Sequence, residues 1–282
     1  MPRLAEIEAH VASMDALQGI VGAMRSLAGI RVQEAQRALP GIRRYAQVMA
    51  EAIGATLPFI EDRRWAAAAA PGRVRGLVVL AAEHGFSGGF NERLMDRLAL
   101  VRDPSDLLLV MGSRGAAVIV ERGLQPTWTH AMATRSGGAL EAAYRLSSEL
   151  FRRLRPGGLA RVEIVFSRFR QLGHWDVEHK SILPLDPAAI PRPPLRQLPL
   201  HNLPPDGLLE KLTGEYVFAQ LMEAIVESIA SENTARFAAM ESATDNVRKK
   251  LDQLRQEANR VRQEEITTEL LDLVVGAEAV GE

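Results

Sequence analysis

One stretch of the sequence without glycine or proline is far longer than an ordinary helix requires. It extends from Glu215 to Val275 and lies between Gly214 and Gly276. Because proline and glycine are the residues that most disfavour a helix interior, and a helix rises 1.5 Å per residue, we expect a single helix on the order of 90 Å long. A mean globular helix has only about 11–12 residues, so this helix must dominate the fold.

Residues along this stretch recur at alternating intervals of four and three, which is the heptad repeat of a coiled coil. Some of these positions hold small or polar side chains, so the seam is weak for a symmetric dimer. We therefore expect an intramolecular partner helix. The predicted seam consists of Val226, Ala230, Asn233, Phe237, Met240, Thr244, Val247, Leu251, Leu254, Ala258 and Val261.

The partner helix is predicted at the other end of the chain, over residues 1–58. Its apolar residues recur every three or four positions, as in an amphipathic helix. Pro40-Gly41 is expected to break or kink it, because proline removes a backbone donor and clashes with the preceding turn. The two terminal helices, 1–58 and 206–282, would pack antiparallel as one unit. The apolar face begins with Leu4, Ile7, Val11, Met14, Leu17, Val21, Met24 and Ala28.

The seam dissolves beyond Val261. A polar segment, residues 262–265, comes first, and apolar side chains then crowd nearly all faces of the helix. One partner helix cannot cover such a surface, and in water it would form a patch prone to aggregation. We therefore expect this tail to sit inside another protein. Its apolar residues are Leu270, Leu271, Leu273, Val274 and Val275.

The middle of the chain, residues 73–200, alternates short apolar runs with helical patterns. Continuous apolar runs are typical of strands buried on both faces. The alternation predicts an α/β domain, Rossmann-like, with a mainly parallel sheet. The Pro-rich stretch 184–205 is interpreted as a linker. Strands are expected at 74–82, 106–112, 127–131, 160–169 and 175–185, and helices at 91–100, 113–123 and 137–154.

Two glycine-containing turns of this domain invite enzymatic interpretations. Gly85-Phe86-Ser87-Gly88-Gly89 matches the G-x-S-x-G nucleophile elbow of hydrolases, but the domain is small and has no HGGG-type oxyanion segment. Gly112 and Gly115 follow the second strand without the G-x-G-x-x-G spacing of a dinucleotide site. Glycines that permit tight turns are the simpler interpretation of both. The triad partners considered for Ser87 were His174, His179, His201, Asp176 and Asp186.

Composition narrows the function classes further. The net charge of −1 gives no argument for nucleic acid, and the absence of cysteine excludes disulfides and thiolate chemistry. No apolar stretch reaches the roughly 18 residues of a membrane helix, and the acidic N-terminus lacks the apolar block of a signal peptide. No histidines and acids have metal-ligand spacing on one helix face, and no cofactor is expected. These features predict a bacterial cytoplasmic protein.

The C-terminal stretch closely resembles the matching helix of F-type ATP synthase gamma subunits. That family carries an Ala-Thr-Asp-Asn element, here Ala243-Thr244-Asp245-Asn246, and an Asn-x-x-Arg-Gln-x-x-Ile-Thr-x-Glu-[Ile/Leu] element, here Asn259 to Leu270. IVGAMRSLAGIRVQEAQ near the N-terminus is similar to the family's first helix. EHGFSGGFN resembles its Gly-Leu-x-Gly-Gly-x-Asn turn. The resemblance covers nearly the whole chain.

The resemblance implies a central rotor shaft without an active site of its own. In the family, the C-terminal end of the helix pair enters a hexamer of alpha and beta subunits, and the α/β domain docks on the membrane ring of c subunits beside an epsilon subunit. The shaft couples proton or sodium flow through the ring to ATP synthesis or hydrolysis, as a peripheral protein on the cytoplasmic face of the bacterial membrane. The hexamer-binding residues implied are Arg262, Gln263, Thr267, Glu269, Met24 and Arg25, and the bearing tip comprises Leu270, Leu271, Val274 and Val275.

Part of the first helix departs from the family pattern. Ile30-Arg31 stands where the family has a Ser-Lys-like pair, and Val32, Gln33 and Glu34 follow, so this patch is less basic than usual. Without the family resemblance, a generic coiled-coil scaffold remains an alternative, and it predicts a capped, soluble helix end in place of the apolar tail.

Overall fold

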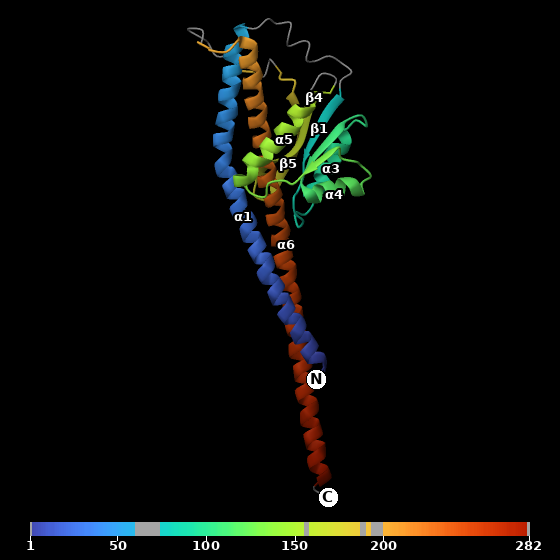
Figure 1. Cartoon of the computed structure of the whole chain (residues 1–282). Helices are drawn as coiled ribbons and strands as arrows, with labels where there is room; N and C mark the ends of the chain where they lie inside the picture. Colours follow the sequence, from blue (N-terminus) through green and yellow to red (C-terminus); the bar gives the residue numbers. More distant parts are fainter. Residues whose placement is uncertain (1, 60–73, 155–157, 187–189, 193–199, 281–282) are drawn as a thin grey trace. The chain divides into compact units, whose positions relative to one another are not determined.

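The computed structural model describes residues 2–59, 74–154, 158–186, 190–192 and 200–280, with side chains up to residue 271. The chain divides into two compact units, residues 1–27 with 238–282, and residues 28–237. Helices α1 and α6 contribute to both units, and the sheet belongs to the second (Figure 1). The elements are α1 (Pro2–Thr56), η1 (Leu57–Phe59), β1 (Val74–Leu80), α3 (Phe90–Val101), β2 (Leu107–Met111), α4 (Ser113–Glu121), β3 (Trp128–His130), η2 (Ser136–Gly138), α5 (Ala139–Arg153), β4 (Leu159–Gln171), β5 (His174–Leu183) and α6 (Pro205–Val280).

The sheet has the strand order β3-β2-β1-β4-β5. Strands β3, β2, β1 and β4 are parallel, and β5 pairs antiparallel with β4 at the edge. From the central strand β1, the chain adds β2 and then β3 on one side. It then crosses to the other side of β1 and adds β4, as in Rossmann-like folds. The predicted α/β class, with its mainly parallel sheet, is confirmed.

Both faces of this sheet are covered, which explains the continuous apolar runs of its strands. Alternate residues of a strand point to opposite faces. On β1, Leu77 and Val79 pack with α3 and α4, whereas Val78 and Leu80 pack with α5, α6 and the part of α1 that belongs to the same unit. From Gly76 to Leu80 every residue of the strand is buried, so polar side chains have no exposed position along this part of it.

The first unit is an antiparallel helix pair, as the heptad pattern predicts. Asp15 pairs with Arg255 at 3.0 Å and Glu8 with Arg262 at 2.6 Å, so seven residues backward along α1 correspond to seven residues forward along α6. Beside the Glu8 pair, Ile7 packs against Leu254, Ala258 and Val261 of α6. Every predicted seam residue of α6 is buried or half-buried. On α1, Leu17 of the expected apolar face is 40% exposed.

The two long helices continue through residues that disfavour a helix interior, in agreement with the predicted ranges 1–58 and 206–282. Pro40 lies inside α1 and does not end the helix. Its side chain is exposed, so the carbonyl that loses its helical partner can bond water instead. Likewise, α6 continues through Gly214 and Gly276. A glycine costs a helix only about 1 kcal/mol, which packing along a long helix offsets. Residues 187–189 and 193–199 of the expected linker lie outside the described residues.

Candidate functional site

The polar segment that follows the seam is anchored by an ion pair. Arg262 Nη2 donates to Glu8 Oε1 at 2.6 Å, and both side chains are about half exposed. Gln263 and Glu269 are exposed, and their side chains lie on the surface of α6. The Thr267 hydroxyl donates to the Gln263 carbonyl at 2.8 Å, within the helix. The segment therefore presents a positioned guanidinium, an amide and a carboxylate toward solvent.

Beyond this segment, α6 extends past the beginning of α1 (Figure 1). The register set by Glu8 and Arg262 brings the first residues of α1 opposite Thr268, so later residues have no partner on α1. Leu270 is 57% exposed, Leu271 is 59% exposed and Ile266 is 50% exposed. Leucines of two adjacent positions point to different faces of a helix, so at least two faces of this end are apolar and open. The side chains of Val274 and Val275 lie outside the described residues.

Met24 and Arg25 lie at a different level of the helix pair. They are half-buried and stand sixteen and seventeen residues after Glu8 on α1. At 1.5 Å per residue, this separates them from the Glu8–Arg262 pair by roughly 24 Å. Extending the same register brings them opposite Asp245, in the Ala-Thr-Asp-Asn element. The candidate residues therefore form two groups, one beside each of the two sequence motifs of α6.

The turn after β1 is not built as a nucleophile elbow. Ser87 is 4% exposed, whereas an elbow presents its nucleophile to the substrate. The strained residue is Phe86, with a φ of 60°, and its side chain is 72% exposed. Two of the histidines considered for a triad bond elsewhere: His179 Nε2 lies 2.7 Å from Glu163, and His201 Nδ1 lies 2.8 Å from the Leu203 carbonyl. The third, His174, lies 3.8 Å from Asp176, and both side chains are about half exposed on β5. The hydrolase interpretation is therefore dropped.

The glycines after β2 are required by close packing. A Cβ on Gly115 would lie 2.0 Å from the Cβ of Ala81, and one on Gly112 would lie 2.3 Å from the Ala81 carbonyl oxygen. Gly112 also has a φ of 112°, which L side chains rarely adopt. The space beside these glycines is filled by the neighbouring strand, so it does not offer a phosphate cradle. Among the described residues, no group of three or more acids or histidines could hold a metal ion.

The C-terminal edge of the parallel strands is occupied by α6 itself. In open α/β sheets this edge is where ligands usually bind. Here the Arg236 guanidinium donates to the His84 and Gly85 carbonyls at 3.4 and 3.2 Å, and pairs with Glu232 at 2.5 Å. Both charged side chains are less than 8% exposed. The heptad pattern did not predict these contacts, because it assigns only one face of α6 to the core.

Further α6 side chains bond the backbone of β4. This strand extends beyond β1, whose pairing ends at Val165. The free N–H groups of the extension are satisfied by α6: Ser167 N–H lies 3.4 Å from Ser228 Oγ, and Phe169 N–H donates to Glu227 Oε2 at 3.1 Å. Buried backbone donors need such partners. The sequence feature that could have indicated these bonds is the group of polar residues from Glu227 to Arg236, which interrupts the apolar pattern of α6.

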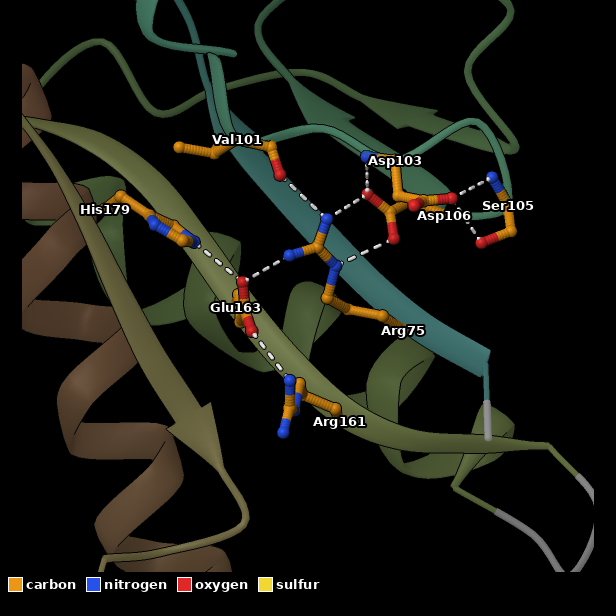
Figure 2. A network of polar contacts seen from close by, with 8 residues as sticks. All are labelled: Arg75, Val101, Asp103, Ser105, Asp106, Arg161, Glu163 and His179. Atoms are coloured by element: carbon orange, nitrogen blue, oxygen red, sulfur yellow. Dashed lines mark hydrogen bonds and ion pairs between the residues drawn. The ribbon is translucent and has the colours of Figure 1, made fainter. Parts of the chain in front are cut away.

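A second polar cluster lies at the opposite end of the strands (Figure 2). Arg75 donates to both oxygens of Asp106, at 2.7 and 2.5 Å, to Glu163 at 2.8 Å and to the Val101 carbonyl at 2.8 Å. The Asp106 hydrogen bond is the main reason that the pKa of Arg75 is raised. Glu163 also contacts His179. With these partners supplied by its own chain, the cluster serves to fix the loop before β2 to the sheet.

The fold and the candidate site together define a class of protein: two long terminal helices that pair antiparallel, an α/β domain between them in the sequence, and an exposed apolar end on the second helix. The family model described as ATP synthase matches residues 3–280. The chain therefore belongs to the ATP synthase family. Within the described residues, no helix is both long enough and apolar enough to cross a membrane.

Curated relatives and solved structures narrow the comparison. The chain is similar to the ATP synthase gamma chain of Methylobacterium nodulans, with 29% identity over 99% of this chain and 100% of the relative. It is 27% identical to that of Thermobifida fusca, over 96% of this chain and 94% of the relative. Its fold matches a chain of the Euglena gracilis mitochondrial ATP synthase rotor with a TM-score of 0.67 at 13% identity, covering 94% of this chain and 99% of that one.

A chain of the Tetrahymena thermophila mitochondrial ATP synthase central stalk and c-ring gives a TM-score of 0.55 at 20% identity. The match covers 79% of this chain and 99% of that chain. At these identities the structural matches establish the fold, and the relatives in sequence establish that the resemblance extends from end to end.

Proposed function

We propose that this chain is the rotating central shaft, the gamma subunit, of an F-type ATP synthase. The observation that carries the proposal is the unpartnered apolar end of α6, with Leu270 and Leu271 more than half exposed. Exposed apolar surface of this kind marks an interaction site. In a family member whose curated relatives are gamma chains, its partner is the hexamer of alpha and beta subunits.

In this role the chain couples two events without performing chemistry on a substrate. Ion flow turns the membrane ring of c subunits, the α/β domain follows the ring together with an epsilon subunit, and the helix pair turns inside the hexamer. Each shaft angle binds one set of subunit conformations better than another, so rotation changes the nucleotide affinities of the catalytic sites in turn. ATP is made or hydrolysed in the partner subunits. The chain itself is non-catalytic and needs no cofactor.

The residues proposed to bind the hexamer form two groups. Arg262, Gln263, Thr267 and Glu269 lie just before the apolar end, where the exposed polar side chains can bond loops of the catalytic subunits. The Glu8 carboxylate holds the Arg262 guanidinium in place, which lowers the entropy cost of binding a second acceptor. Met24 and Arg25 form the other group. Leu270, Leu271, Val274 and Val275 act as the bearing surface.

The proposed location is peripheral, on the cytoplasmic face of the bacterial plasma membrane. The ring supplies the membrane anchor in this arrangement.

Co-expression with alpha and beta subunits tests the proposal. The full chain should join their hexamer and promote its ATPase activity, and a chain that ends at Glu269 should bind much more weakly because it keeps the polar contacts and lacks the apolar end. Leu172→Ala serves as the matched control, since Leu172 is 50% exposed in the β4–β5 turn, outside the proposed contact. If the full chain neither joins the hexamer nor raises its activity, the shaft assignment fails.

A further inference from the structure

Glu227 on α6 is a buried carboxylate that connects three elements of the second unit. Its side chain is 1% exposed. Oε1 accepts a hydrogen bond from Arg43 Nη2 on α1, and Oε2 accepts the Phe169 N–H of β4 at 3.1 Å. A single carboxylate therefore bonds both long helices and the sheet.

Stability alone does not explain this carboxylate. Burial raises the pKa of Glu227, and the bonds from Phe169 and Arg43 do not fully offset that effect. Burying an ion pair often contributes less to stability than apolar residues of similar size would, and its best-attested benefit is a fixed register. The cost of burial thus points to a role that apolar packing cannot fill.

That role is resistance to sliding. The α/β domain packs on α1 and α6 mainly through apolar side chains. Apolar attraction is non-directional, so by itself it does not specify one position of a packed element along another. Hydrogen bonds weaken steeply when their angle and distance change. A charge-assisted bond across such an interface therefore fixes the position of one element along another.

The neighbouring acid Glu223 provides an internal comparison. It lies one turn earlier on α6 and accepts a hydrogen bond from Arg43 Nε at 3.0 Å. This hydrogen bond joins α6 to α1. Toward the sheet, Glu223 has a charge interaction with Lys180 of β5 and, within the described residues, accepts no backbone N–H of a strand. Glu223 and Glu227 thus share one partner and differ in the bond to Phe169.

We propose that Glu227 is a joint that fixes the α/β domain to both long helices, in addition to the bonds that Ser228 and Arg236 make from α6 alone, so that torque applied to the domain turns the shaft without slip. The proposal rests on the rotor function above and assigns it a positioning residue. Arg43 and the Phe169 N–H are the two contacts through which Glu227 acts.

The experiment uses the complete synthase in membrane vesicles and measures ATP hydrolysis and ATP-driven ion pumping in parallel. For Glu227→Leu, which removes both bonds at similar volume, pumping per ATP hydrolysed is expected to fall about twofold or more while hydrolysis persists, because the register is no longer fixed. Glu227→Gln keeps an oxygen that can accept the Phe169 N–H, so its ratio should lie between those of the leucine variant and the wild type. Glu223→Leu should keep the wild-type ratio.

The outcomes separate the two proposals. If the wild-type chain does not assemble or pump, the rotor function itself fails. If the wild-type complex pumps and Glu227→Leu pumps equally well per ATP, or if Glu223→Leu loses as much, the joint is overturned. Where Glu227→Leu does not assemble, Glu227→Gln is compared with Glu223→Gln: a lower ratio for the former supports the joint, and equal ratios overturn it.

Discussion

Residues 225–236 and residues 240–261 belong to one helix, α6, yet they are buried in different ways. Every residue from 225 to 236 is buried, including charged ones. From Met240 to Val261, the buried residues recur at heptad spacing and the residues between them are mostly exposed. The first stretch packs on a sheet and on other helices, and the second packs on one helix.

This difference shows what a helical sequence reveals about its surroundings. A single partner leaves a periodic trace, because one face of the helix is apolar. Several partners remove the periodicity, and polar residues then enter the interior wherever a strand end supplies free backbone groups. A helix interior that holds Glu227, Ser228, Glu232 and Arg236 therefore indicates a crossing over the edge of a sheet.

The largest effect is expected from Arg236→Ala in the fully buried stretch. The change leaves the Glu232 carboxylate buried without its counter-charge, and breaking such a pair costs about 3–5 kcal/mol. Chemical denaturation of the purified chain measures the loss of unfolding free energy. The double change Glu232→Gln with Arg236→Met should recover part of it. A loss below about 1 kcal/mol in the single variant would be typical of an exposed pair and would contradict the burial.

A smaller loss is expected from Leu251→Ala in the heptad stretch. Leu251 is 1% exposed, and a leucine-to-alanine change in a packed interior costs about 2–4 kcal/mol, with less where neighbours can relax. Leu270→Ala is the matched control, because the same deletion at a 57% exposed position should barely change the unfolding free energy of the isolated chain. Equal losses at the two positions would show that the apolar end is covered within this chain.

The fully buried stretch of α6 contains Glu227, and this carboxylate should give the unfolding free energy a pH dependence. Because burial raises its folded pKa above the ordinary value of 4.5, the folded state holds this proton more tightly than the unfolded state does. The contribution of this proton to the unfolding free energy is present in full below pH 4.5 and is lost as pH rises through the pKa that Glu227 has in the folded state. The unfolding free energy of the wild type should therefore fall relative to that of Glu227→Gln over this range. A difference that grows in the opposite direction would contradict the raised pKa.

The smallest effect on the isolated chain is expected from Arg262→Ala. The Glu8–Arg262 pair is half exposed, and such pairs contribute at most about 1 kcal/mol. In the assembled complex, the loss of a charged hydrogen bond at this position should cost about 1.5–3 kcal/mol of binding. The ratio of these two costs, measured by denaturation and by hexamer binding, tests whether Arg262 serves a partner. Full binding by the variant would remove it from the contact.

The sequence allowed the prediction of elements whose pattern depends on their own residues. The seam of α6 has an apolar period of about 3.5 residues, and the buried strands of the sheet are continuous apolar runs. Both patterns were sufficient to predict these elements correctly. The helices continue through Pro40 and Gly214, as the predicted ranges 1–58 and 206–282 require, because local propensity is weak against tertiary packing along a long helix. The bonds from Glu227 and Arg236 to the strand ends were missed, because they depend on which backbone groups the sheet leaves unpaired, and no local pattern encodes that.

The central claim, that this chain is a shaft turned inside a hexamer, is tested most directly by watching it turn. Alpha and beta subunits are immobilised with the chain in place, a visible probe is attached to the α/β domain, and ATP is added. The account predicts sustained rotation in one direction that stops when ATP is removed. A chain that stays bound while the hexamer hydrolyses ATP, without any rotation of the probe, would contradict it.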